Sequence, residues 1–391
     1  MSIGKILIGT SGWSYDDWVG PFYFDYKNMF SQYIEVFNTV EVNSTFYSYP
    51  TPGLIRGLIR SSPRYFKFSL KLPRLITHKK KFNPKMGLKS DIDRFIELVK
   101  PLREKGKLGA ILVQLPPVSM SEAPYLSDFL DLLPYDNFPF AVEFRNESWL
   151  NEEVLDALKD RNIAYCIVDE PLLPPHTYVT ADFSYIRWHG RGQRPWYYYL
   201  YTEEELKEWV PRVKEVASKV KVVYGYFNNH FRGFAPKNAL QMILLLGIGH
   251  FGHEFKLKEI DKYFKEKAIE KAKKSFEELI ARGEADVGDI LLIFMNEKRL
   301  ERAKGIPNSE VKLTITKEYV KARVKEYFIE IDLTNRRITH NCADWMKRIE
   351  SKRFCKHLGK IFLVMPKDVA LKILQDIAGN IDEWEFIYEE G

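Results

Sequence analysis

Short apolar runs recur along the first two thirds of the chain, and each is bounded by turn residues and followed by a stretch with helical spacing. These runs cover residues 5–9, 39–42, 66–70, 110–114, 140–144, 164–168, 185–188 and 222–227. Nearly continuous runs of Val, Ile and Leu are typical of strands that are buried on both faces. Amphipathic segments such as 92–105 and 152–161 lie between them. Eight repeats of strand and helix predict an α/β fold, a (β/α)8 TIM-like barrel, over residues 1–250.

A different pattern begins near residue 251. Residues 255–282 are rich in charge and carry apolar positions at helical spacing, which predicts a helix. Segments with strand-like alternation, or with a turn that leads into a strand, cover 311–314, 320–331 and 335–339. A second helical pattern follows over 358–364. Together these segments predict a small α+β domain over residues 251–391.

Composition and charge narrow the class of protein. The chain has 391 residues and a formal net charge of +6, which weakly favours an anionic partner. Charged residues make up 29% of the chain, as is also typical of the ion-paired surface of a thermophile's protein. Three cysteines are too few for a disulfide framework and fit a reducing compartment. Because we find neither a signal-peptide pattern nor an apolar run of about 20 residues, we expect a soluble, cytoplasmic protein.

Polar residues stand where each expected strand ends. In TIM barrels the C-terminal strand ends form the active-site face, so we expect these groups to meet at one mouth. The candidate catalytic residues are Glu41, Lys71, His78, Glu143, Arg145, Asp169, Arg187 and His189. Candidates for contacts with nucleic acid are Trp13, Tyr47, Trp149, Trp188, Asn228 and Asn229. Each has a structural alternative: Glu143 and Arg145, two positions apart, could simply form an ion pair.

The candidate set suits phosphate chemistry. Carboxylates with a histidine can bind a divalent metal that activates water, and Arg or Lys can hold phosphate oxygens. Only His78 and His189 lie at strand ends, with His176 and His230 in loops, so a trinuclear metal centre is not expected. One divalent metal in the barrel, or none, stays open.

Several runs in the barrel region are similar to those of a known family. They are Gly9-Thr-Ser-Gly-Trp-Ser-Tyr, Glu41-Val-Asn-Ser-Thr-Phe-Tyr, Gln114-Leu-Pro-Pro, Val142-Glu-Phe-Arg, Arg187-Trp-His-Gly and Phe227-Asn-Asn. In this order, over about residues 3–248, they resemble the YecE-like family, domain of unknown function 72. The resemblance implies a barrel like that of the apurinic endonucleases and sugar isomerases. By that fold analogy alone it suggests a role connected with DNA.

The expected C-terminal domain holds a candidate metal site. His340-Asn-Cys342 and Cys355-Lys-His357 are two ligand pairs separated by a short insert, and they can close around one tetrahedral zinc ion. The pattern resembles the SWIM zinc finger, with His340 where that family has cysteine. The resemblance implies binding of nucleic acid or of another protein. The alternatives are a three-ligand site without His340 and a metal-free domain with two buried thiols.

The leading hypothesis is a nucleic-acid-processing enzyme, a DNA endonuclease that acts on single-stranded or damaged DNA in repair. Glu143 and Asp169 would hold a metal or act as base, and His189 would be a general acid or ligand. Lys71, Arg145 and Arg187 would hold phosphate, and the zinc module would bind the strand or a repair-protein partner. The alternatives are a non-catalytic nucleic-acid-binding protein and a small-molecule enzyme acting on a sugar or sugar phosphate. In the last case the aromatic run 196–201 could form a lid.

Overall fold

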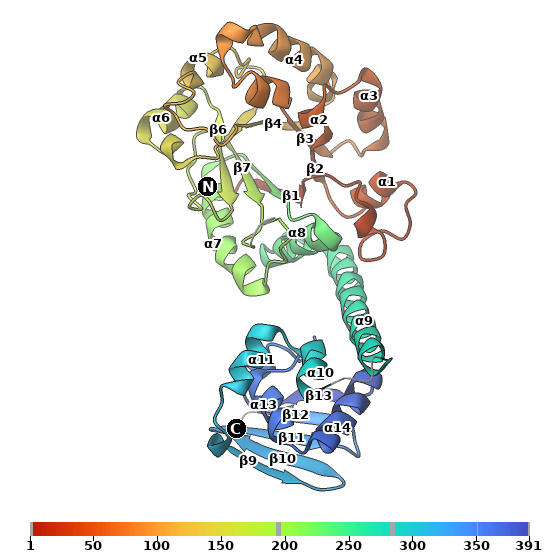
Figure 1. Cartoon of the computed structure of the whole chain (residues 1–391). Coiled ribbons are helices and arrows are strands. Elements are labelled where there is room, and N and C mark those ends of the chain that lie inside the picture. The colour runs from red at the N-terminus through yellow and green to blue at the C-terminus, as the bar shows by residue number, and fades with distance from the viewer. Residues whose placement is uncertain (1–2, 193–196, 282–285, 350, 390–391) are drawn as a thin grey trace. The chain divides into compact units, whose positions relative to one another are not determined.

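The computed structural model describes residues 3–192, 197–281, 286–349 and 351–389. The chain divides into two compact units, Met1–Ile260 and Asp261–Gly391 (Figure 1). The division falls inside the helix α9, Phe251–Ala281, ten residues beyond the change of pattern seen in the sequence.

Eight parallel strands form the centre of the first unit. They are β1 Lys5–Thr10, β2 Thr39–Val42, β3 Lys67–Lys71, β4 Leu108–Gln114, β5 Phe140–Glu143, β6 Ala164–Asp169, β7 Phe183–Trp188 and β8 Val222–Phe227. Their order in the sheet is β1-β8-β7-β6-β5-β4-β3-β2. An isolated bridge between Ser11 and Glu41, with a 2.8 Å hydrogen bond from Gly12 N to Glu41 O, joins the two ends. The sheet is therefore a nearly closed barrel, which confirms the predicted TIM-like fold.

Helices follow the strands in the order that the sequence pattern predicts. They are α1 Met29–Ile34, α2 Ser44–Tyr47, α3 Pro52–Ser61, α4 Leu88–Glu104, α5 Leu126–Leu130, α6 Glu152–Asp160, α7 Glu203–Lys219 and α8 Phe234–Leu245. Short helical turns lie at Asp16–Trp18, Leu75–Lys79, Pro84–Met86, Glu147–Trp149 and Phe231–Gly233. The start of α7 is fixed by a capping box: Thr202 Oγ1 accepts from Glu205 N at 3.2 Å, and Glu205 Oε2 accepts from Thr202 N at 2.8 Å.

Side chains alternate between the inside and the outside of the barrel wall, because successive residues of a strand point to opposite faces. On β6, Ala164, Cys166 and Val168 lie in the interior cluster together with Leu112 of β4 and Tyr185 of β7. Two residues beyond the last inward-facing residue of a strand, the side chain again faces inward and points into the C-terminal mouth. This alternation decides which polar residues meet there.

The second unit is an α+β domain built on a five-stranded sheet. Its strands are β9 Val311–Ile315, β10 Tyr319–Val324, β11 Tyr327–Asp332, β12 Arg337–His340 and β13 Glu385–Tyr388, in the order β13-β12-β11-β10-β9. Its helices are α10 Val287–Phe294, α11 Glu297–Lys304, α12 Ala343–Met346, α13 Lys356–Val364 and α14 Lys367–Gly379, with a short turn at Asn308–Glu310. Val320 and Ile329 of the sheet share one buried core with Leu358 and Ile361 of α13. Strands β9 to β12 are antiparallel neighbours, and β13 pairs in parallel with β12.

None of the helices in the described parts of the chain combines the length and the apolar character needed to cross a membrane.

Candidate active site and candidate metal centre

A buried ion-pair network lies at the mouth of the barrel. Arg187 at the end of β7 places Nη2 2.8 Å from Glu41 Oε1 and Nη1 2.6 Å from Glu143 Oε2. Glu41 and Glu143 are 0% exposed and Arg187 is 1% exposed. Charges so deeply buried need partners, and one guanidinium here serves two carboxylates from β2 and β5.

Neutral groups complete the hydrogen bonding of both carboxylates. The Tyr185 hydroxyl donates to Glu41 Oε2 at 2.7 Å, and Gln114 Nε2 donates to Glu143 Oε1 at 2.9 Å. Burial alone would raise the pKa of these carboxyls. Arg187 beside Glu41, and Arg145 with Arg187 beside Glu143, outweigh burial and lower both pKa values. Glu41 and Glu143 are therefore ionised and fully engaged.

Glu170 also lies at the mouth, although it is not among the residues predicted from the sequence. Arg145, which pairs with Glu143, also places Nη1 2.5 Å from Glu170 Oε2. Burial raises the pKa of Glu170 to about 7 despite Arg145. Glu170 Oε1 is buried and has no hydrogen-bond partner among the described residues. A carboxyl with a free oxygen and a pKa near neutrality suits proton transfer.

Asp169 does not join this network, which corrects the predicted set. Its carboxylate points to the outside of the barrel, where it accepts from Trp209 Nε1 of α7 at 2.7 Å and from Arg191 Nε at 3.1 Å. Asp169 therefore attaches β6 to α7. The period of two that places Val168 inside also places residue 170 inside, so the strand alternation was the signal that identifies Glu170.

Lys71 reaches the mouth from β3 and carries an ammonium group that is easily deprotonated. Burial, followed by the charge of Arg187, lowers the pKa of Lys71 to about 8. Its Nζ lies 4.7 Å from the centroid of the Phe46 ring, and no hydrogen bond of Nζ is found in the described parts of the chain. Lys71 is thus a cation that is available to a substrate.

Both predicted histidines lie near these groups. Burial and Arg187 lower the pKa of His189 to about 3, so its imidazole is neutral. Asn228 Nδ2 lies 2.9 Å from His189 Nδ1, and His189 Nε2 lies 3.3 Å from Arg187 Nη1 and 3.4 Å from Glu143 Oε1. His78 is half-buried, its ring lies 5.0 Å from that of Phe46, and burial lowers its pKa.

Two of the four aromatic candidates for base stacking are buried in the barrel wall, so the prediction is wrong for them. Trp149 is 1% exposed and packs on Phe144, and Trp188 is 0% exposed and packs on Phe227. Asn229 is also buried, where its Nδ2 donates to Tyr199 O and to Asn238.

Tyr47 and Trp13 are the candidates that a base could reach. Tyr47 is 69% exposed, and Trp13 is half-buried with its ring 5.2 Å from that of Phe30. Asn228 is partly exposed beside His189. Trp196 of the expected lid lies outside the described residues.

The rim next to Lys71 is basic. The segment between β3 and α4 exposes Arg74, Lys79, Lys81 and Lys85. The Arg74 guanidinium lies 5.9 Å from the centroid of the Tyr47 ring. Because this segment leaves the C-terminal end of a barrel strand, it places positive charge at the mouth.

The mouth carboxylates are poorly disposed to bind a divalent metal. Glu143 already accepts from Arg145, Arg187 and Gln114, and a cation placed there would face two guanidinium groups. Among the described residues, the one group of three or more closely spaced His, Cys, Asp or Glu side chains lies in the second unit.

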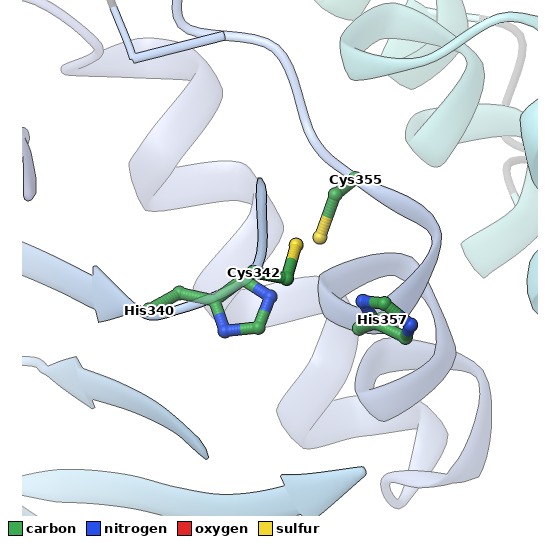
Figure 2. Close-up of side chains that lie close together, drawn as sticks. All are labelled: His340, Cys342, Cys355 and His357. Atoms are coloured by element: carbon green, nitrogen blue, oxygen red, sulfur yellow. The ribbon is translucent and has the colours of Figure 1, made fainter. Parts of the chain in front are cut away.

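That group consists of the four residues predicted from the sequence. The ligand atoms of His340, Cys342, Cys355 and His357 all lie within 4.8 Å of one another, and all four side chains are buried (Figure 2). His340 is the last residue of β12, and Cys342 directly precedes α12. Cys355 directly precedes α13, and His357 lies in the first turn of α13. The two thiol sulfurs point toward each other between the imidazole rings, and the cysteines are free (Figure 2).

The hydrogen bonds of the cluster leave its ligand atoms open toward the centre. His340 Nδ1 donates to Phe328 O at 2.5 Å, whereas His340 Nε2 and His357 Nδ1 are buried without a hydrogen-bond partner in the described structure. The adjacent Cys355 thiol lowers the pKa of Cys342. A carbonyl that fixes one ring nitrogen while the other stays open is typical of metal-ligating histidine. The cluster can therefore bind a metal ion.

Comparison with known proteins agrees with the barrel. The family described as "Protein of unknown function DUF72" matches residues 7–259. The UPF0759 protein YunF of Bacillus subtilis is 26% identical over 274 residues, which cover 63% of this chain and 96% of YunF. The UPF0759 protein YecE of Escherichia coli K12 is 27% identical over 211 residues, 47% of this chain and 74% of YecE.

Solved structures give the same result. A DUF72 family protein from Thermotoga maritima has 34% sequence identity and a TM-score of 0.56, and the match covers 62% of this chain and 99% of that protein. The residues that match the family end at 259, next to the boundary of the second unit at Asp261. Because the family model matches nearly the whole of its barrel unit, this chain belongs to the DUF72 family.

Proposed function

We propose that the barrel is an enzyme that processes nucleic acid by acid–base chemistry on a phosphodiester, with single-stranded or damaged DNA as substrate. One observation carries the proposal: the mouth combines the buried network around Arg187 with Arg145, Glu170 and Lys71. The last two are a carboxyl and an ammonium whose pKa values, about 7 and about 8, lie near neutrality. Groups tuned in this way are typical of active sites.

The roles follow from the charges. Lys71, whose ammonium has no hydrogen bond among the described residues, would hold a phosphate oxygen and stabilise negative charge as it develops. Arg145, whose guanidinium is paired with Glu143 and Glu170, would hold Glu170 in position. Glu170, with its free oxygen, would take a proton from the attacking water. As the new phosphorus–oxygen bond forms and the bond to the leaving oxygen breaks, Lys71 would donate its proton to that leaving oxygen. Arg187 would not touch the substrate, because Glu41 and Glu143 occupy its donors.

The basic rim favours a nucleic-acid strand, which carries many phosphates, over a small substrate with one phosphate or none. Arg74, Lys79 and Lys81 would neutralise phosphates on either side of the reacting bond, and the exposed ring of Tyr47 could stack on an unpaired base.

A zinc ion is the metal we propose for the second unit. Two thiolates and two imidazoles suit tetrahedral zinc, and with all four positions filled by protein the ion would be structural. We propose that this module, in the manner implied by its likeness to SWIM zinc fingers, helps the barrel to engage a strand or a repair-protein partner.

A second candidate function rests on the depth of the site. Lys71 is 7% exposed and Glu170 is 6% exposed, so a substrate must reach into the mouth to meet them. A small sugar or sugar phosphate does this more easily than a strand, and it would use the same groups.

A cleavage assay tests the proposal. End-labelled single-stranded, duplex and abasic DNA would be incubated with the full chain and with Glu170→Gln and Lys71→Met variants. Glu153→Gln and Lys159→Gln, on the exposed face of α6, are the matched controls. We expect cleavage that both mouth variants lose and both controls keep. Binding without cleavage would indicate a non-catalytic binding protein, and neither binding nor cleavage would favour the small-molecule enzyme.

A further inference from the structure

The sheet of the second unit has one packed face and one open face. Val320, Ala322 and Val324 of β10 are buried, whereas Lys321 and Arg323 between them are exposed. We define the open sheet face by the outward residues of β9, β10 and β11, which are Lys312, Thr314, Lys321, Arg323, Phe328 and Glu330. These three strands are neighbours in the sheet (Figure 1).

Two cations oppose each other directly on this face. The register pairs Arg323 of β10 with Lys312 of β9, and like charges at directly opposed positions destabilise a sheet. Neither side chain has an ion-pair partner among the described residues. The neighbouring Lys321, in contrast, lies 3.2 Å from Glu330. The face therefore neutralises one cation and leaves the opposed pair open to an external anion.

An aromatic ring continues the same row. Phe328 of β11 is the register partner of Arg323 on its other side, so Lys312, Arg323 and Phe328 follow one another across three strands. Phe328 is 37% exposed, although the next inward residue, Ile329, is 0% exposed. A ring beside two unpaired cations gives a base something to stack on and its phosphates something to pair with.

The backbone that carries this ring is hydrogen-bonded to residues of the candidate metal centre and its neighbour Asn341. Phe328 N–H donates to Asn341 Oδ1 at 2.9 Å, and Phe328 O accepts from His340 Nδ1 at 2.5 Å. The backbone of Phe328 is thus fixed by the segment that supplies the first two metal ligands. A ring on a fixed backbone loses less conformational entropy when a ligand binds.

We infer that the open sheet face binds single-stranded nucleic acid, with phosphates at Lys312 and Arg323 and an unpaired base on Phe328. The phosphates of a duplex could pair with the two cations, but its bases are already stacked on each other and could not stack on Phe328. The carboxylates of an acidic peptide could also pair with the cations, but such a peptide has no base to stack on the ring. The inference depends on this surface alone and not on catalysis in the barrel, although it names where a strand processed there would be held.

Fluorescence anisotropy with a labelled oligothymidylate tests the inference. The full chain would carry Glu170→Gln throughout, so that absence of cleavage and absence of binding are scored separately. We expect Lys312→Gln with Arg323→Gln to weaken binding by about tenfold or more and to reduce the salt dependence by about 1.4 in slope, the value for two phosphate contacts on a single strand. We expect Phe328→Ala to weaken binding by about fivefold or more.

The control removes two cations that are already paired and lie outside this face. Lys325 lies 3.3 Å from Glu310, and Lys304 lies 2.8 Å from Glu301. Lys304→Gln with Lys325→Gln should therefore leave affinity within about twofold. Unchanged affinity in both sheet-face variants would overturn the inference. Equal competition by duplex DNA or by polyglutamate, together with no effect of Phe328→Ala, would also overturn it.

Discussion

The Arg187 guanidinium lies 2.6 Å from the Glu143 carboxylate, and both side chains are almost wholly removed from solvent. A buried pair of this kind adds little net stability, but losing one partner leaves the other charge without compensation. Arg187 also compensates the buried charge of Glu41, so its loss would leave two carboxylates without this partner.

Replacing Arg187 by Met should therefore destabilise the barrel by about 3–5 kcal/mol, measured by urea unfolding. Arg56→Met, on the exposed surface of α3, should change stability by less than about 0.5 kcal/mol. Adding Glu143→Gln to Arg187→Met should recover part of the loss, because one uncompensated charge is removed. A loss below about 1 kcal/mol for Arg187→Met would contradict the role assigned to the network.

Glu170 should make stability depend on pH in the direction opposite to an ordinary paired carboxylate. Its folded-state pKa of about 7 lies above the ordinary value of 4.5. Its favourable contribution is therefore present below 4.5 and is lost as the pH rises through 7, and the difference amounts to about 3 kcal/mol. Urea unfolding of the parent chain and of Glu170→Gln, at about pH 5 and about pH 8, measures it. The parent should lose stability relative to the variant at the higher pH, and parallel curves would refute the shifted pKa.

The proposed acid–base pair also sets the pH dependence of turnover. Activity should rise as Glu170 loses its proton through a pKa of about 7 and should fall as Lys71 loses its proton through a pKa of about 8. We expect a bell-shaped profile of kcat with its maximum between these values. Glu170→Gln should lower kcat by about 10²- to 10⁴-fold with little change in KM. A variant that keeps the rising limb would show that another group is the base.

Cys166, the cysteine that lies outside the metal cluster, offers a control for the candidate metal centre. The purified chain should bind about one equivalent of zinc, as one closed tetrahedral site requires. Cys355→Ser should lose the ion, because it removes one of the four clustered ligands. Cys166→Ser, buried in the barrel, should keep it. Zinc content by elemental analysis decides between these outcomes. Equal content in all three proteins would refute the assignment.

The regular part of the barrel could be predicted almost residue by residue. The expected strand 222–227 coincides with β8, because turn residues bound a continuous apolar run. The C-terminal hairpin was predicted less well. The sequence showed one alternating segment over 320–331, whereas the structure has two strands, β10 and β11, separated by a turn in which Lys325 has a positive φ of 57°. β13 was not foreseen, because its parallel pairing with β12 depends on contacts far apart in the chain.

The candidate sites show a similar contrast. His340, Cys342, Cys355 and His357 were identifiable because metal ligands in close pairs carry a chemical signal of their own. At the barrel mouth, polar residue type was insufficient. Trp188 and Asp169 were assigned to the mouth by their position at a strand end, whereas the strand alternation places them in the outer wall.

The ends of β6 show what this alternation imposes on the chain. Asp169 and Glu170 are adjacent, yet one holds a helix against the outer wall and the other faces the mouth. Inserting a single residue within β6 would turn Asp169 into the mouth and move Val168 to the outer wall. Trp209 would lose its acceptor, and the mouth would receive a carboxylate shorter by one methylene. The length of β6 is thus constrained from both sides of the wall, and variation in length between relatives should begin only after residue 170.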